Sequence, residues 1–417
     1  MVIKIKLKHD IVWPLLLILL LQYWGVSGEK ILALTVIWYI YLSVKNNKIK
    51  LMIPKVRGLG FYSLIILISV IVGLIINLPR DIAKDIFYSV PTVLIIAVGY
   101  MYNVSEKERS IKKTLYLAGV IMSLLSFSKV LLNVSVLSDL SSIRDIMGGS
   151  VYEVSLIAAM MFTEKIVGEK VIFSKKSDWI IFIILLLKCT TSLGRAEMLV
   201  TLLMMILALV INIYLKRKQL KTIVRVFKIV IVSVISCVVI WNILPKTART
   251  QFVNKLEYSF EEIDTKSEYD STADAMQHWR AYEIQCAKNQ WQEYNAINAL
   301  IGEGFGTYIR IEYIPDNFTD DMITYHGIAL LHNSYYTFLI KSGILGVTAI
   351  LWLYLSNILP VFFTRKKEKY NNLAILTVIT LGMALYTYFV RGIFSQTMWA
   401  SWGIMAGWIN AEIRKVK

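Results

Sequence analysis

The chain has 417 residues, of which 56% are hydrophobic and only 18% are charged, and its formal net charge is +16. Its mean hydropathy of +0.58 excludes an ordinary soluble domain. Apolar runs long enough to cross a bilayer recur along the chain, and they are continuous rather than alternating. The sequence therefore predicts an all-α polytopic membrane protein.

Twelve membrane-spanning helices are predicted in chain order. They cover residues 11–26, 30–44, 59–78, 86–104, 114–137, 151–168, 179–194, 197–215, 227–244, 333–358, 371–390 and 397–411. The first span follows three lysines, as a signal peptide does, but Val26-Ser27-Gly28 is a poor cleavage site, so we expect a retained anchor. The predicted organisation is an N-terminal bundle of about nine helices (1–244), a loop subdomain (245–332) and about three C-terminal helices (333–417).

The distribution of Lys and Arg predicts the orientation. Alternate connections, counted from the amino terminus, carry 29 of the 45 basic residues. Loops rich in Lys and Arg face the cytoplasm, so both termini are expected there. The net charge then reflects topology and contact with anionic lipid headgroups. A nucleic-acid partner is not expected, because no soluble segment has a basic face interleaved with aromatic residues.

The long loop is consequently expected outside the cytoplasm. Between Pro245 and Leu330 it carries seven basic and fourteen acidic side chains, a balance opposite to that of the basic loops. Apolar and aromatic residues at helical spacing predict one uninterrupted helix over 273–300, lying at the membrane surface. The glycines of 302–306 predict a turn after it. A phosphate-cradling loop is the alternative, although the Lys-Ser/Thr of a P-loop is missing.

Ionisable residues inside predicted spans are costly unless they are paired or face a cavity. Lys188 lies deep in its span, and we expect it to pair with Glu153 or Glu197. Arg195 is expected at the extracytoplasmic end of its helix, and Arg391 at the start of the last hairpin on the same side.

The residues His332-Asn333-Ser334-Tyr335-Tyr336 stand where the long loop ends and the next span begins. An imidazole, an amide and a hydroxyl grouped at a membrane surface indicate a reaction site that faces a lipid-borne substrate. An ordinary polar helix cap is the simpler interpretation of His332, and His326 is a second candidate for a catalytic histidine.

Three features in order resemble the family of bacterial O-antigen ligases and O-antigen or capsular polysaccharide polymerases. The first is the Ser192-Leu193-Gly194-Arg195 turn between two spans. The second is Arg280 followed by the glycines of 302–306, and the third is His332-Asn333-Ser334-Tyr335 entering a span. The resemblance covers roughly 180–350. It implies a GT-C-like fold and glycosyl transfer from a glycan linked to undecaprenyl pyrophosphate.

The chemistry implied by this resemblance assigns roles to the residues. A neutral imidazole at His332 would act as general base on the attacking sugar hydroxyl, and guanidinium groups would stabilise the leaving pyrophosphate. The candidate substrate-binding residues are Arg195, Arg280, Asn333, Ser334, Tyr336, Arg391 and Arg310. The displacement would be single and inverting, and neither a metal nor another cofactor is expected.

Several functions remain open at the level of sequence. A polymerase that uses another lipid-linked repeat unit as acceptor is favoured, because the long loop is acidic and irregular. A ligase that transfers the glycan to lipid A core is the alternative, followed by a lipid-linked saccharide transporter or flippase and by a non-catalytic scaffold. The expected location is the bacterial inner membrane, with a periplasmic active site. Membrane lipids, a chain-length regulator and a flippase are the expected partners.

Overall fold

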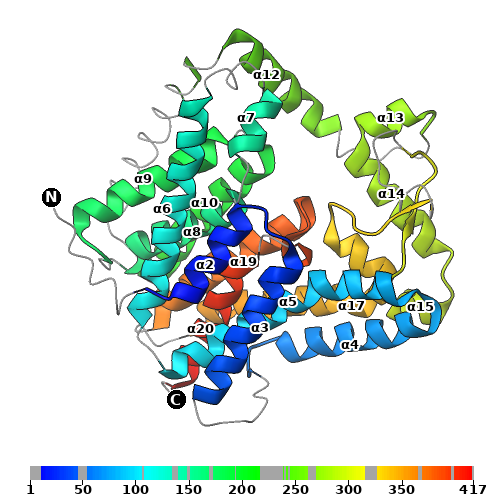
Figure 1. Cartoon of the computed structure of the whole chain (residues 1–417), viewed down its shortest axis with the longest axis horizontal. Coiled ribbons are helices and arrows are strands. Elements are labelled where there is room, and N and C mark those ends of the chain that lie inside the picture. Colours follow the sequence, from blue (N-terminus) through cyan, green and yellow to red (C-terminus); the bar gives the residue numbers. More distant parts are fainter. Residues whose placement is uncertain are drawn as a thin grey trace.

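The computed structural model (Figure 1) describes most of the chain. It describes residues 11–45, 54–105, 108–133, 140–147, 151–168, 172–192, 194–216, 238, 241–242, 245–261, 269–314, 326–364, 369–395 and 399–415. The predicted span over 227–244 lies almost entirely outside these residues, so the structure does not test it.

Helices form nearly all of the regular structure. In chain order they are α2 (Trp13–Tyr23), α3 (Gly28–Lys45), α4 (Leu59–Ile76), α5 (Pro79–Ser105), α6 (Glu108–Leu132), α7 (Leu140–Met147), α8 (Val151–Thr163), the π-helix η2 (Glu164–Gly168), α9 (Lys175–Thr191), α10 (Arg195–Lys216), α12 (Lys246–Glu261), α13 (Thr272–Gln277), α14 (Trp279–Gln292), α15 (Ala296–Ile301), α17 (Ser334–Ile358), α18 (Pro360–Phe363), α19 (Tyr370–Phe389), the 3-10 helix η4 (Gly392–Phe394) and α20 (Ala400–Lys415). Two short strands, β1 (Ile309–Arg310) and β2 (Gly327–Ile328), pair antiparallel, with Ile309 opposite Ile328.

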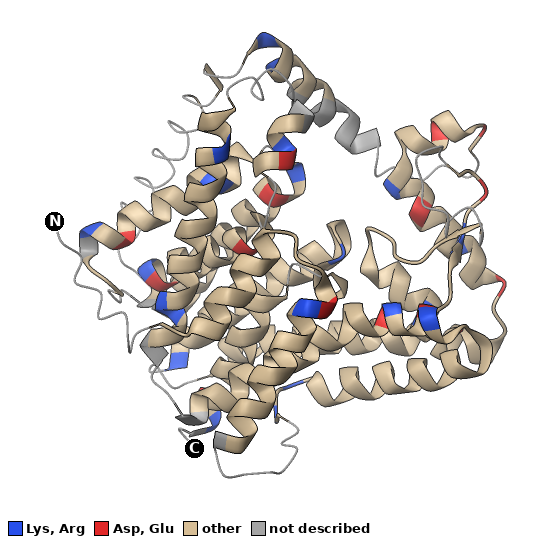
Figure 2. Ribbon diagram, viewed as in Figure 1, with Lys and Arg blue, Asp and Glu red and all other residues tan. Residues whose placement is uncertain are grey.

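Six helices of the described chain are long and apolar enough to cross a membrane. They are Leu59–Ile76, Pro79–Asn103, Ser110–Leu132, Arg195–Leu215, Ser334–Phe363 and Tyr370–Phe389. Figure 2 shows the most apolar of them, α4, without a single charged residue. The chain is thus an all-α membrane protein, as its composition predicts. The predicted count of twelve spans goes beyond these six; α2, for example, is apolar but has only 11 residues.

The last helix, α20, packs along α5 at very short range. A side-chain carbon added at Gly99 would lie 2.2 Å from the Ile404 carbonyl oxygen, and one added at Gly407 would lie 2.0 Å from the Ile96 carbonyl oxygen. Both distances are severe clashes. Glycine at these positions lets the two backbones approach each other, which is the usual way in which membrane helices gain packing contacts.

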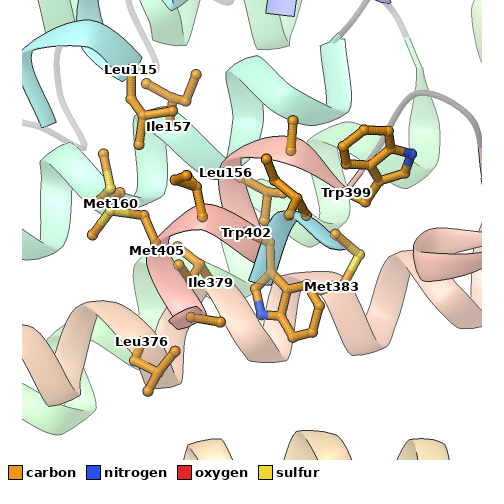
Figure 3. Packing of buried hydrophobic residues seen from close by; sticks show 14 of the residues in the cluster. Leu115, Leu156, Ile157, Met160, Leu376, Ile379, Met383, Trp399, Trp402 and Met405 are labelled. Atoms are coloured by element: carbon orange, nitrogen blue, oxygen red, sulfur yellow. The ribbon is translucent and has the colours of Figure 1, made fainter. Parts of the chain in front are cut away.

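The centre of the bundle is filled by large apolar side chains from α8, α19 and α20. Figure 3 shows Trp402 and Met405 of α20 together with Leu156 of α8 and Met383 of α19. All four are buried. The one polar atom of the Trp402 ring, Nε1, donates to the Thr380 hydroxyl at 3.0 Å. The core therefore buries an indole without leaving its N–H unsatisfied.

The expected pairing of Lys188 with a carboxylate is wrong. Its ammonium donates to the Ser126 hydroxyl at 2.7 Å and to the backbone carbonyl of Met147. Met147 is the last residue of α7, where unsatisfied carbonyl groups and the helix dipole favour a cation. Lys188 therefore satisfies a helix terminus, a role that residue spacing alone does not reveal.

Glu153, one of the two expected partners, satisfies a different helix terminus. Its carboxylate accepts hydrogen bonds from the backbone N–H groups of Ala400 at 2.9 Å and Ser401 at 3.1 Å. These are the first residues of α20, where free N–H groups and the helix dipole favour an anion. A buried acid on α8 thus fixes the start of the last helix.

The long loop forms the helices α12 to α15 along the upper and right edges of Figure 1, and α14 and α15 pack against α17. The prediction of one uninterrupted helix over 273–300 is wrong, because the chain breaks twice. His278, with φ −112° and ψ 33°, separates α13 from α14. Asn295 then starts α15 by accepting a hydrogen bond from the Asn298 N–H at 2.9 Å. An Asn side chain in this role favours a new helix start over continuation of the old one.

Candidate active site at the start of α17

A histidine and a buried carboxylate meet where α14 packs against the start of α17. The Nδ1 atom of His332 lies 3.0 Å from Oε1 and 3.1 Å from Oε2 of Glu283. The backbone N–H of His332 also donates to Glu283 Oε2, at 2.9 Å. Glu283 thus holds both the ring and the main chain of His332, and fixes the orientation of the imidazole.

This contact determines which ring nitrogen remains available. An ionised carboxylate can only accept hydrogen bonds. In the neutral imidazole of His332, Nδ1 therefore carries the proton and Nε2 keeps its lone pair. The Glu283 side chain is 3% exposed, whereas that of His332 is 37% exposed. The pair therefore combines a buried orienting carboxylate with a solvent-accessible imidazole, which is the arrangement of a general base and the group that positions it.

Arg391 is tied to the same segment through its backbone. Its N–H donates to the His332 carbonyl at 2.7 Å, and its carbonyl accepts from the Ser334 hydroxyl at 2.7 Å. Arg391 has φ 78°, a left-handed conformation that costs about 1–3 kcal/mol in a residue with a side chain. The two hydrogen bonds to residues 332 and 334 help to hold this conformation. Ser334, predicted to bind substrate, is buried and positions Arg391.

Asn333, next to His332 in sequence, and Arg391, bonded to His332 through its backbone, each have a buried side-chain donor that lacks an acceptor among the described residues. These donors are Nε of Arg391 and Nδ2 of Asn333. The other side-chain atom of Asn333, Oδ1, accepts from the Tyr335 N–H at 3.1 Å and so caps α17. A buried donor without an acceptor is unfavourable unless a ligand satisfies it. The two donors are therefore available to an anionic oxygen.

Of the remaining predicted arginines, Arg280 lies near Tyr152 of α8, and Arg195 begins the helix whose Glu197 contacts the same tyrosine. Arg280 lies one helical turn before Glu283, so the two share a face of α14. The charge of Arg280 acts on the Tyr152 hydroxyl, which also forms a hydrogen bond with Glu197. Arg195 begins α10, two residues before Glu197, and is half-buried. The structure thus brings Arg280 and the first turn of α10 to one hydroxyl group; Leu193, in the preceding turn, is outside the described residues.

Arg310 does not join this group. Its guanidinium Nη2 lies 3.0 Å from Oε2 of Glu293, and both side chains are largely exposed. Glu293 comes ten residues after Glu283, which corresponds to roughly 15 Å along a helix. The structure therefore places Arg310 on a separate part of the loop from His332.

An apolar hollow of 440 Å³ begins beside the candidate site. Asn333 and Tyr336, at the start of α17, line one part of it, and Leu339, Ile344 and Leu351 extend it along the same helix. Tyr388, near the end of α19, completes the lining. The polar start of α17 thus continues directly into an apolar surface on one of the six apolar helices. Tyr336, a predicted substrate-binding residue, belongs to this hollow.

The predicted turn at 302–306 is present, and its backbone N–H groups form hydrogen bonds within the protein. The backbone N–H groups of residues 303 to 306 each donate to an acceptor from another segment. In chain order the acceptors are the carbonyls of Ile340, Lys341 and Ser69, at 3.1, 3.0 and 2.8 Å, and Oδ2 of Asp85, at 2.6 Å. None of these four donors remains for a phosphate, so the alternative of a phosphate-cradling loop is wrong.

A buried ion pair fastens this turn to the membrane helices. Lys341 Nζ of α17 lies 2.5 Å from Oδ2 of Asp85 on α5, and both side chains are only 1% exposed. Lys341 also donates to the Thr307 carbonyl, at 2.7 Å. A side-chain carbon at Gly304 would lie 2.2 Å from the backbone nitrogen of Gly73 on α4. The glycines thus permit direct backbone contact between the turn and three helices.

Two residues of this region are not among the predicted site residues. Glu283 is the only carboxylate in α14 and lies one turn after Arg280, which is a weak signal of a shared face. Asp85 lies just outside the predicted span over 86–104, although α5 begins at Pro79. Neither position indicates its partner, because the partners are 49 and 256 residues away.

Comparison with known proteins does not identify the chain: no protein-family model matches it, and no curated protein is significantly similar to it.

Proposed function

We propose that this protein is a glycosyltransferase that transfers a glycan from undecaprenyl pyrophosphate to a sugar hydroxyl. The observation that carries the proposal is the His332–Glu283 pair at the start of an apolar helix. In the proposed reaction His332 Nε2 accepts the proton of the attacking hydroxyl. The oxygen forms the new glycosidic bond at the anomeric carbon as the carbon–oxygen bond to pyrophosphate breaks, so one bond forms as one breaks, with inversion.

The neighbouring groups suit the two parts of such a donor. The leaving pyrophosphate gains negative charge, which donors and guanidinium groups can stabilise. Arg391 and Asn333 have buried donors without a described acceptor, and Arg280 lies one turn from Glu283. The apolar hollow along α17 suits the hydrocarbon chain of the carrier. A donor in this position would have its charged group beside His332 and its lipid tail in the hollow.

The proposed placement is the bacterial inner membrane, with both termini in the cytoplasm and the loop over 245–332 in the periplasm. The twelve-span topology and the GT-C-like architecture belong to the same proposal. They rest on the distribution of Lys and Arg and on the resemblance of residues 180–350. Lipid-linked glycans that have been moved to the outer leaflet would then reach His332 directly. A flippase and a chain-length regulator remain the proposed partners.

The direct test is transfer by the purified protein. The full chain in detergent, without an ion gradient or nucleotide, should convert a lipid-linked oligosaccharide into a longer lipid-linked product, followed by gel electrophoresis and mass spectrometry. Transfer to lipid A core instead would identify a ligase. Movement of the intact lipid-linked donor across vesicles without any new glycosidic bond would contradict both enzymes and favour a transporter.

Replacement of the arginines by lysine should show whether pyrophosphate binding needs only a positive charge or also the planar guanidinium group. Lysine keeps the positive charge but loses the planar fork that binds two oxygens at once. Arg391→Lys and Arg280→Lys are therefore expected to lower turnover about tenfold or more. Arg310→Lys is the matched control, because Arg310 pairs with an exposed Glu293. Equal activity of all three variants in the transfer assay would remove the arginines from pyrophosphate binding.

Thiol labelling should report the side of the membrane on which the loop lies. Burial raises the pKa of Cys286 to about 11, so at pH 8 its reactive thiolate is about 100-fold scarcer than for a thiol of pKa 9. Native Cys286 should therefore react slowly, and faster as the pH rises. A cysteine at the exposed Ala273 of α13 should react quickly with an impermeant reagent on intact cells.

The control for this experiment is a cysteine at Lys176, an exposed residue in a predicted cytoplasmic loop. It should react only after the membrane is made permeable. The reversed pattern, with Lys176→Cys reactive and Ala273→Cys protected, would place the loop in the cytoplasm and contradict a periplasmic active site.

A further inference from the structure

A polar groove of 620 Å³ runs beside α14 on the face next to Glu283. One wall is α14 itself, where Tyr282, Asn289 and Glu293 recur at helical spacing. The opposite wall is formed by residues 269–270 and by residues 310–313, which include the end of β1 and the residues directly after it. The mechanism proposed above does not use this groove, although Tyr282 is adjacent in sequence to the carboxylate that holds His332.

Three tyrosines fix the shape of the groove. The ring of Tyr282 lies 5.1 Å from that of Tyr269 and 6.0 Å from that of Tyr313, measured between centroids. The Tyr282 hydroxyl accepts from the backbone N–H groups of Glu312 and Tyr313, at 2.8 and 2.7 Å. The Tyr313 hydroxyl donates to the Tyr269 carbonyl at 2.6 Å. These hydrogen bonds hold the walls together without a ligand, so little ordering is needed on binding.

The polar groups of the groove have a surplus of negative charge. Arg310 is matched by Glu293 at 3.0 Å, which leaves the exposed carboxylates of Asp270 and Glu312. Along the α14 wall, the side-chain amide of Gln285 donates to that of Asn289 at 2.9 Å. Neighbouring amides and carboxylates offer alternating donors and acceptors, and a partly exposed Tyr313 adds an aromatic ring.

We propose that this groove binds a segment of glycan made of neutral or amino-bearing sugars, at a distance from the reacting unit. Vicinal sugar hydroxyls both donate and accept, which matches the Gln285–Asn289 pair, and sugar C–H faces pack on aromatic rings. The two surplus carboxylates favour an ammonium group and disfavour uronic acids. That the groove binds the growing glycan or the acceptor glycan during transfer rests on the proposed function. Glycan binding itself does not.

Other ligand classes fit the groove less well. The surplus carboxylates repel the phosphates of a nucleotide, and the amides and carboxylates would be left unsatisfied by a lipid chain. The two carboxylates would also attract a basic peptide, so the experiment compares such a peptide with the oligosaccharides.

The test is binding of the purified full-length protein in detergent to an array of linear four-sugar oligosaccharides. Three sets are compared: neutral hexoses, hexosamines with free amines, and uronic acids. The wild type should bind the first two sets about tenfold more tightly than the third. Reversal of the two surplus charges in Asp270→Lys/Glu312→Lys should invert this preference. Glu29→Lys, an exposed charge reversal on α3, is the control and should change nothing.

Binding is measured without turnover, which separates this inference from the proposed reaction. His332→Ala should retain glycan binding while losing transfer. Absence of binding to all three sets, or a preference that the double charge reversal leaves unchanged, would overturn the inference even if the protein proved to be a transferase. Tighter binding of a lysine-rich peptide than of any oligosaccharide would also overturn it.

Discussion

His332→Ala is expected to lower the rate of glycosyl transfer by roughly 10²–10⁴-fold, the usual contribution of a positioned general base. The imidazole is more than one-third exposed, whereas its partner Glu283 is buried, so removing the ring should leave the fold intact. Turnover is measured with the purified protein and a lipid-linked donor. Added imidazole should restore part of the activity, because it can enter the space left by the side chain.

His326→Ala is the matched control for this prediction. His326 is exposed and lies six residues earlier. Within the described part of the chain its backbone carbonyl accepts from the Ile311 N–H at 3.0 Å. We expect this variant to keep near-normal activity. If instead His326→Ala were inactive and His332→Ala active, the His332–Glu283 pair would have a structural role only.

Glu283→Gln tests the positioning role separately. Glutamine keeps the shape of the side chain but removes its charge, and its amide can place a donor where Nδ1–H requires an acceptor. We expect kcat to fall while KM for the donor changes little, since Glu283 contacts the imidazole and not the substrate. A rise in KM at constant kcat would mean that Glu283 supports substrate binding instead.

Asp85→Asn is expected to lower the free energy of unfolding by about 3–5 kcal/mol, the usual cost of removing one partner from a buried ion pair. The ammonium of Lys341 would stay buried opposite a neutral amide, and the Gly306 N–H would lose its charged acceptor. The effect should appear as a lower midpoint of thermal unfolding in detergent. Amide hydrogen exchange at residues 303–306 should accelerate at the same time.

Two further variants show whether this effect belongs to the turn. Asp85→Leu/Lys341→Met removes both charges and should be less destabilising than Asp85→Asn, because no lone charge remains buried. Lys112→Met breaks another buried pair, with Glu164 at 3.0 Å. That variant should be destabilised without faster exchange at residues 303–306. Equal exchange at the turn in every variant would contradict a specific link between the ion pair and the turn.

Sequence patterns predict the parts of the fold that depend on local composition. The uniform apolar run of α4 needs no distant information to be recognised as a membrane helix. The break at Asn295 was missed because the aromatic and apolar residues keep their helical spacing across it, and only the Asn side chain favours a new start. The partner of Lys188 was misjudged because the sequence shows charges but not helix ends.

The candidate site was predicted only in part, for a similar reason. The position of His332 at the edge of a predicted span indicates a candidate site residue. Its partner Glu283 belongs to a segment 49 residues earlier, and only the packing of α14 on α17 brings them together. The backbone link of Arg391 to His332 depends on a left-handed conformation that no residue pattern encodes. Arg310 belongs to β1 and lines the groove beside α14, where it pairs with Glu293.

The contacts of the glycine turn also set an order of events during synthesis. The turn at 302–306 is bonded to α4 and α5, which are made before it, but also to Ile340 and Lys341 of α17, which are made after it. His332, the contact of Glu283, likewise follows the loop helices in the chain. The whole segment over 245–332 is therefore synthesised before Ile340 and Lys341 of α17, to which its glycine turn is bonded. A chain that stops before Lys341 should retain the earlier membrane helices with a loop that is not fixed to them.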